Sequence, residues 1–93
     1  MEQVVISDHA RFEMDRRHID EEVVLKVAHN PEQVLTAGKG RLVHQGKYHD
    51  PVEAREMLLR VVLERRAGEL HVVTVYKTSR IDKYWRREVQ EQE

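Results

Sequence analysis

The first third of the chain has apolar residues at helical spacing and predicts two helices. After a short apolar run, Ser7 or Asp8 offers a side-chain oxygen to cap the free amides of a helix that begins near His9. A second helix begins at Asp20 and ends before Pro31, because the residue before a proline avoids helical angles. Its buried stripe is aliphatic and consists of Val23, Val24, Val27 and Ala28.

After the second helix the hydrophobic pattern alternates with a period of two, which is typical of strands. Four such segments are predicted, at residues 32–37, 41–48, 55–65 and 70–78. Helix is the competing interpretation of residues 55–65. We prefer a strand, because Ala67-Gly68 is a turn signal and a β-branched run follows, so that the last two segments form an antiparallel hairpin. A short basic helix is predicted from Ile81 to about Val89.

These elements predict an α+β fold, in which two N-terminal helices pack on one face of a four-stranded, mainly antiparallel sheet and a short C-terminal helix follows. The aliphatic side chains of the hairpin would face the helices, namely Met57, Leu59, Val61, Leu63, Val73 and Val75. The polar side chains between them would face away, namely Arg60, Thr74, Tyr76 and Thr78. Such an arrangement is either an open polar platform for a ligand or the solvated face that antiparallel sheets commonly have.

Composition limits the class of protein. The chain has 93 residues, which suits a single domain over residues 1–93. It has no cysteine, hence no disulfide or thiolate site, and no apolar stretch approaches the roughly 20 residues that span a bilayer. The N-terminus does not resemble a signal peptide, so we expect a soluble, cytoplasmic protein without membrane partners. Histidines at metal-ligand spacing and a glycine-rich phosphate loop are both lacking, so no metal or cofactor is expected.

Positive charge is concentrated near the C-terminus. The net charge is −1, so a polyanion site would have to come from such local segregation. Cations, hydroxyls and an aromatic ring follow a buried strand and could bind phosphates and stack on bases. The candidate substrate-binding residues are therefore Tyr76, Lys77, Thr78, Ser79, Arg80 and Lys83. Alternatively, Tyr84 and Trp85 pack the last helix onto the sheet and the cations are solvated, which is the favoured interpretation for a lone tryptophan.

Three residues at i, i+4 and i+8 line one edge of the first predicted helix, His9, Glu13 and Arg17. Metal-free RNA cleavage needs such groups to move protons and to stabilise charge on the phosphate. In this hypothesis His9 and Glu13 exchange protons, and the phosphate is held by Arg17, Arg60 and Lys77. The candidate catalytic residues are thus His9, Glu13, Arg17 and Arg60; the alternative is a surface ladder of salt bridges.

From Ile6 to Trp85 the chain resembles the bacterial domain-of-unknown-function family 4258. The opening motif of that family is matched by His9, Ala10, Met14 and Arg17, and its closing motif by Val73–Lys77, Thr78, Ser79 and Lys83–Trp85. Glu13 departs from the family, which usually has a basic residue there. The resemblance implies the outline of the small RelE/ParE-like toxins and a grouping with metal-independent ribonucleases of the barnase, EndoU and colicin type.

Three functions follow from these patterns. The first is a metal-independent ribonuclease of toxin type. The second is a non-catalytic module of the same fold that binds RNA or a partner protein, such as a cognate antitoxin-like protein. The third is a homodimer whose polar sheet face is the interface. Glu13 in place of the family's basic residue favours weakened or altered chemistry, whereas intact Thr78-Ser79 favours retained binding.

Overall fold

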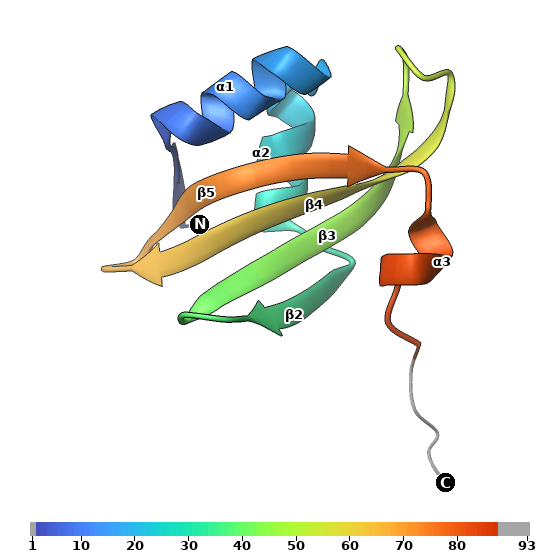
Figure 1. Ribbon diagram of the computed structural model, residues 1–93. Helices are drawn as coiled ribbons and strands as arrows, with labels where there is room; N and C mark the ends of the chain where they lie inside the picture. Colours follow the sequence, from blue (N-terminus) through green and yellow to red (C-terminus); the bar gives the residue numbers. More distant parts are fainter. Residues whose placement is uncertain (1, 88–93) are drawn as a thin grey trace, which may run out of the picture.

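The computed structural model describes residues 2–87 and has two helices on one side of a five-stranded sheet (Figure 1). The sheet order is β1-β5-β4-β3-β2; β1 pairs with β5 in parallel and all other neighbours are antiparallel. The predicted α+β class, with two N-terminal helices and a short C-terminal one, is confirmed, but the sheet has one strand more than predicted. The elements are β1 (Gln3–Ile6), α1 (Asp8–Arg17), α2 (Glu21–His29), β2 (Gln33–Ala37), β3 (Arg41–Asp50), β4 (Arg55–Arg66), β5 (Glu69–Thr78) and α3 (Ile81–Tyr84).

The additional strand is β1, whose apolar run is too short for its period to identify a strand. Its pairing runs from Gln3 opposite Glu69 to Ile6 opposite Val72. A parallel pair requires a long crossover connection, and here every element from α1 to β4 lies between the two strands in sequence. The prediction of four strands was therefore wrong because this pairing joins distant parts of the chain.

Both N-terminal helices begin where their capping residues predict. The Ser7 Oγ accepts a hydrogen bond from the Ala10 N–H at 3.0 Å and donates one to the Val73 carbonyl at 3.2 Å. Ser7 thus caps α1 and also ties the start of that helix to β5. Asp20 immediately precedes α2, and the helix ends two residues before Pro31.

The hydrophobic core lies between the sheet and the two helices, α1 and α2. Its most buried aliphatic members come from α1, α2, β4 and β5. Each of them is at most 1% exposed: Ala10, Val24, Ala28, Leu59, Val61, Leu63, Val72 and Val75. The inward-facing pattern predicted for β4 is thereby confirmed. This packing leaves the opposite face of the sheet free of both helices (Figure 1).

One residue of the predicted inward set faces the wrong way, because β5 contains a bulge. Val62 lies opposite Thr74, whereas the next residue, Leu63, lies opposite Val72, so that Val73 is an extra residue. Val72 therefore enters the core in its place. The prediction for Val73 was wrong because a bulge changes the phase of alternation within a strand.

The C-terminal helix, α3, is shorter than predicted. It spans Ile81–Tyr84, and Trp85 already has an extended backbone. The side chain of Gln33 donates to the Arg86 carbonyl at 2.6 Å and accepts from the Arg86 N–H at 2.9 Å. These two bonds hold the chain beside edge strand β2 and replace the next helical turn. The end predicted for the helix, at residues 88–89, lies outside the described residues.

Candidate nucleic-acid interface

The sheet face turned away from α1 and α2, which we call the open face, is centred on Arg60 of β4. The strand register places Arg60 between Gln45 of β3 and Tyr76 of β5. Its Nε donates to Gln45 Oε1 at 2.9 Å, and its Nη1 donates to the Tyr76 hydroxyl. The guanidinium carbon lies 4.4 Å from the ring centroid of Tyr84 and 5.5 Å from that of Tyr76. We call these four residues the Arg60 cluster.

The support of this cluster is Gln45, which is fully buried. Its Oε1 accepts from Arg60, and its Nε2 donates to Gln33 Oε1 at 2.8 Å and to the Tyr84 carbonyl at 3.1 Å. Because the amide is bonded on both sides, its orientation is fixed. The network thereby holds α3 against the sheet, with the Tyr84 ring over the Arg60 guanidinium.

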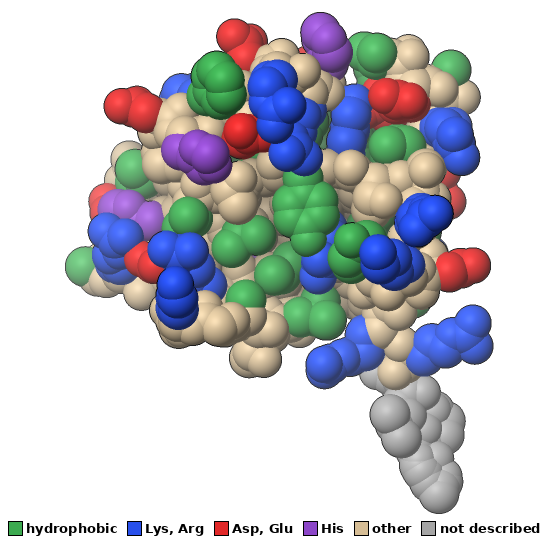
Figure 2. Space-filling model, viewed as in Figure 1, with side chains coloured by type: hydrophobic (Ala, Val, Ile, Leu, Met, Phe, Trp, Pro, Cys, Tyr) green, Lys and Arg blue, Asp and Glu red, His purple; other side chains and the backbone are tan. Residues whose placement is uncertain are grey.

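The positive charge of the cluster is not neutralised by its neighbours. No carboxylate oxygen of residues 2–87 lies within 4.0 Å of the Arg60 guanidinium. In that part of the chain the same is true of three cations around α3, namely Lys47, Arg80 and Lys83. Figure 2 views this face and shows Lys and Arg side chains beside the central hydrophobic ones. This end of the open face therefore offers unmatched charge to an anion.

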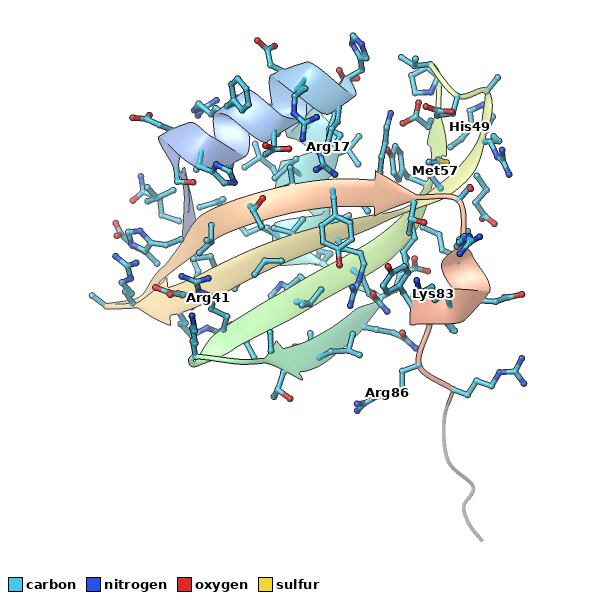
Figure 3. The ribbon with its side chains drawn as sticks, viewed as in Figure 1. Arg17, Arg41, His49, Met57, Lys83 and Arg86 are labelled. Atoms are coloured by element: carbon cyan, nitrogen blue, oxygen red, sulfur yellow. The ribbon has the colours of Figure 1, made fainter. Side chains whose placement is uncertain are left out.

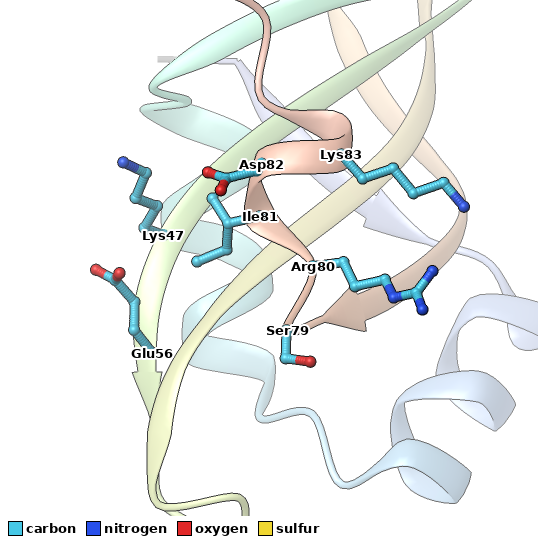
Figure 4. A pocket seen from close by; sticks show the side chains of 7 residues that line it. All are labelled: Lys47, Glu56, Ser79, Arg80, Ile81, Asp82 and Lys83. Atoms are coloured by element: carbon cyan, nitrogen blue, oxygen red, sulfur yellow. The ribbon is translucent and has the colours of Figure 1, made fainter.

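A hollow of about 560 Å³, which we call the α3 hollow, opens beside the cluster (Figure 4). Lys47 and Glu56 form one side, and Ser79, Arg80 and α3 form the other. Three cations and two carboxylates line it, so the hollow retains a positive balance. Its full lining is Lys47, Glu56, Ser79, Arg80, Ile81, Asp82 and Lys83.

A second hollow, of about 380 Å³, lies at the opposite end of the open face and includes His9. Val4 and Ile6 pack against the core, so Val5 between them faces away from it and lines this hollow. Arg41 marks the same end of the sheet, away from α3 (Figure 3). We call this the β1 hollow, and its lining is Val5, Ser7, His9, Arg41, Arg66, His71, Val72 and Val73.

A third hollow, of about 560 Å³, separates the end of α1 from the end of β5. Figure 3 shows Arg17 on this last turn of α1, above the end of β5. Five of the candidate residues line this α1 hollow, namely Arg17, Lys77, Thr78, Ser79 and Arg80, together with Arg16, His18, Glu53 and Met57.

The carboxylate of Glu13 is bonded to arginines. Its Oε1 accepts from Arg16 Nη2 and from Arg17 Nε, both at 2.7 Å, and no hydrogen bond within residues 2–87 joins it to His9. The hydrogen bonds from Arg16 and then Arg17 hold the pKa of Glu13 below its usual value. Glu13 is therefore an ionised group that orients two guanidinium groups.

The ammonium of Lys77 belongs to a buried ion pair on the helix side of the sheet. Its Nζ lies 2.7 Å from Asp50 Oδ2, and the two side chains are 8% and 1% exposed. Asp50 also accepts from the Tyr48 hydroxyl and from the N–H groups of Val52 and Glu53. Burial by itself raises the pKa of Asp50, but these hydrogen bonds, led by that from Lys77, outweigh it and keep the pKa well below its usual range. An anionic ligand would thus compete with Asp50 for Lys77.

The residues predicted to form a site are consequently divided among separate places. Arg60 and Tyr76 lie together at the centre of the open face, whereas His9 lines the β1 hollow and Thr78 lines the α1 hollow. Lys83 lines the α3 hollow, with Ser79 and Arg80 shared between that hollow and the α1 hollow. The catalytic and binding roles of these residues remain predictions.

Sequence reasoning missed two residues of the open face. Gln45 lies opposite Arg60. The exact length of the turn at residues 50–54 fixes the register of the β3–β4 hairpin, and that register predicts this pair. His71 lies opposite Glu64 and beside Val5, and only the unrecognised β1 pairing brings it to His9.

Metal-ligand clusters and membrane-spanning helices are both missing from residues 2–87. No three His, Cys, Asp or Glu side chains there are grouped so as to hold a metal ion. None of the helices in this range is long and apolar enough to cross a membrane.

The fold and the open face together define a small α+β domain in which α1 and α2 cover one sheet face and α3 covers only part of the other. The chain belongs to the family described as "Domain of unknown function (DUF4258)", which matches residues 6–77. The resemblance predicted from the opening and closing motifs is thus confirmed. The match includes His9, Arg60 and Tyr76 but ends before α3. No match was found among curated proteins or among solved structures.

Proposed function

We propose that this protein binds single-stranded RNA through the open face, with the Arg60 cluster at the centre of the interface. The observation that carries this proposal is an arginine that is held by neutral partners alone, Gln45 and the Tyr76 hydroxyl, and that lies over the ring of Tyr84. It stands on a sheet face that neither α1 nor α2 covers. A cation fixed without a carboxylate partner is ready to bind an anion. The two aromatic rings beside it offer surfaces on which bases stack.

Charge and aromatic surface favour a single strand over a duplex. Unpaired bases stack on aromatic side chains or on arginine, at about 1–3 kcal/mol for each base, whereas the bases of a duplex are already stacked on each other. Unmatched cations continue from Arg60 towards α3, namely Lys47 on β3, Arg80 just before α3 and Lys83 within it. They provide contacts to successive phosphates along the face.

Binding is better supported than cleavage by the four predicted catalytic residues. Glu13 is held ionised by Arg16 and Arg17, which makes it a poor proton donor. His9 and Arg60 do not line the same hollow. A general acid or base must reach the proton that it moves, so this set does not assemble into one centre.

Fluorescence anisotropy with a labelled oligouridine tests the proposal on the full chain. We expect Arg60→Gln to weaken binding roughly 5- to 150-fold, which corresponds to the loss of one stacked base at about 1–3 kcal/mol. Arg55→Gln is the matched control, because Arg55 is an exposed arginine of the same strand. Four phosphate contacts at about 0.7 each predict a slope of about −3 for log K against log salt concentration.

Circular dichroism establishes that both variants are folded. Equal affinities of Arg60→Gln and Arg55→Gln, or no binding by the unmodified chain at low salt, would refute the proposed interface.

A further inference from the structure

We propose that two copies of this chain associate through edge strand β2, whose free edges pair antiparallel and join the two sheets into one. This inference does not depend on RNA binding. It also differs from a dimer through the polar sheet face, because pairing at β2 leaves the open face of each copy accessible.

The hydrogen-bonding edge of β2 that points away from β3 has no partner strand in residues 2–87. β2 is the last strand in the sheet order and forms the rim of the sheet, at the bottom of Figure 1. Within the same part of the chain, the backbone of residues 33–37 is bonded to β3 alone, since the bonds between Gln33 and Arg86 use the Gln33 side chain. Alternate residues of an edge strand turn their N–H and C=O groups outward, so this edge can accept another strand.

The edge also lacks the features that usually keep sheet edges from pairing, which are charged side chains, proline and bulges. The sequence of β2, QVLTA, contains no charged residue and no proline, although 35% of the residues of the chain are charged. Its register with β3 is continuous from Gln33 to Ala37. Val34 is 53% exposed. β2 is therefore a regular, uncharged edge with an exposed aliphatic side chain.

The strand is complementary to a second copy of itself. Antiparallel pairing centred on Leu35 places Leu35 opposite Leu35 of the partner copy, and Val34 opposite Thr36 of the partner copy. Such cross-strand contacts stabilise a sheet, and no like charges face each other in this register. Each copy has one β2 edge, so pairing about a two-fold axis stops at two copies.

Charges just beyond the two ends of β2 favour a second copy as the occupant. In the register centred on Leu35, Glu32 lies opposite Gly38 of the partner copy, one residue from Lys39. Within residues 2–87, neither Glu32 nor Lys39 has an ion-pair partner within 4.0 Å. Glu32 Oε1 accepts from the Lys47 N–H, which leaves Oε2 for an ammonium. Pairing thus brings an unmatched carboxylate beside an unmatched ammonium at both ends of the interface.

The dimer places both Arg60 clusters on one surface. The two-fold axis of an antiparallel strand pair is perpendicular to the sheet, so the two open faces lie on the same side. Five strand spacings of about 4.8 Å separate β4 from β4 of the partner copy, which places the two clusters about 24 Å apart across the strands.

The direct test is a disulfide, because the chain has no cysteine of its own. Leu35→Cys places the two thiols opposite each other, at a Cα separation of about 4.5–5.5 Å that suits a disulfide. Val52→Cys is the control, since Val52 is 62% exposed and lies in the turn between β3 and β4. Under mild oxidation we expect Leu35→Cys to form covalent dimers at least about tenfold faster, because pairing raises the effective concentration of the second thiol. Equal rates would overturn the inference.

Sedimentation velocity of the full chain over a range of concentrations measures association without a cross-link. A pair of five-residue strands is a small interface, so we expect a weak dimer with a dissociation constant in the micromolar to millimolar range. Val34→Lys adds a lysine to the edge and should raise that constant at least about tenfold. Val52→Lys is the matched control, because it is the same change at an exposed valine outside β2, and it should leave association unchanged. Circular dichroism establishes that both variants are folded.

A charge exchange tests the register and the identity of the partner. Glu32→Lys and Lys39→Glu each place like charges at both ends of a homodimer, so each variant alone should associate more weakly than the unmodified chain. An equal mixture of the two restores opposite charges at both ends and should associate more tightly than either variant alone. Loss of the bond to the Lys47 N–H does not explain this difference, because Glu32→Lys lacks that bond in both samples.

Three outcomes would refute the inference and leave the proposed function untouched. The chain could remain monomeric at the highest concentration. The mixture could associate no better than the single variants, which would contradict the antiparallel register. Growth beyond two copies would mean that β2 pairs with a different surface of the next copy.

Discussion

Replacing Asp50 by asparagine is expected to destabilise the fold strongly, because it leaves the Lys77 ammonium buried without a counter-ion. The Lys77 side chain is 8% exposed. Its other oxygen partner in residues 2–87 is the His18 carbonyl, at 3.5 Å. Removing one partner of a buried ion pair costs about 3–5 kcal/mol, since the remaining charge is not solvated. That is a large part of the 5–15 kcal/mol that typically stabilises a domain.

The converse substitution, Lys77→Met, should cost less. Asp50 would still accept hydrogen bonds from the Tyr48 hydroxyl and from two backbone N–H groups, whereas Lys77 in the first variant keeps one long contact. The double variant has neither the Asp50 nor the Lys77 charge, so no buried charge is left without a partner. Its loss of unfolding free energy should therefore be smaller than the sum of the two single losses, by about 0.5–3 kcal/mol.

Urea denaturation followed by circular dichroism measures these free energies. Glu21→Gln is the control, because it breaks the exposed Arg11–Glu21 pair, whose side chains are 53% and 50% exposed. We expect that variant to lose less than about 1 kcal/mol. Single losses that add without coupling, or an Asp50→Asn loss no larger than that of the control, would refute the reasoning about the buried pair.

Two further predictions concern packing and acid stability. Val72→Ala should cost about 2 kcal/mol by removing buried methyl groups, and Val73→Ala much less; equal losses in urea denaturation would contradict the bulge. Burial lowers the pKa of His44, and the bond of the imidazole to the Ala28 carbonyl opposes this by a smaller amount. The folded protein therefore favours neutral His44, and stability that is present above pH of about 6.5 is lost as the pH falls below this value. The depressed pKa of Asp50 likewise adds stability above pH of about 4 that is lost on further acidification. A free energy of unfolding that is constant from pH 7 to about 3 would contradict both assignments.

Much of the sheet and of the Arg60 cluster could be predicted from the sequence, because both depend on local patterns. The alternation in β4 and the turn signal at Ala67-Gly68 define a hairpin. That hairpin places Arg60 and Tyr76 on neighbouring strands and on the same face. In the observed register the two residues lie opposite each other. Helix starts were equally local, since Ser7 and Asp20 precede apolar stripes.

The features that could not be predicted depend on distant contacts or on a change of phase. The pairing of β1 with β5 joins the first and last strands, and it alone brings His9 to His71. The burial of Lys77 on the helix side of the sheet could have been predicted from the sequence. The alternation that directs Val75 to the helices also directs Lys77 there, and a buried lysine requires a partner such as Asp50.

The binding face can be observed directly by nuclear magnetic resonance of the isotope-labelled full chain during titration with oligouridine. RNA on the open face should shift the Arg60 Nε–Hε signal and the ring signals of Tyr76 and Tyr84, while signals of α2 on the opposite side stay in place. Shifts confined to α1 and α2, with the Arg60 signal unchanged at saturation, would contradict the assignment of this face as the RNA-binding surface.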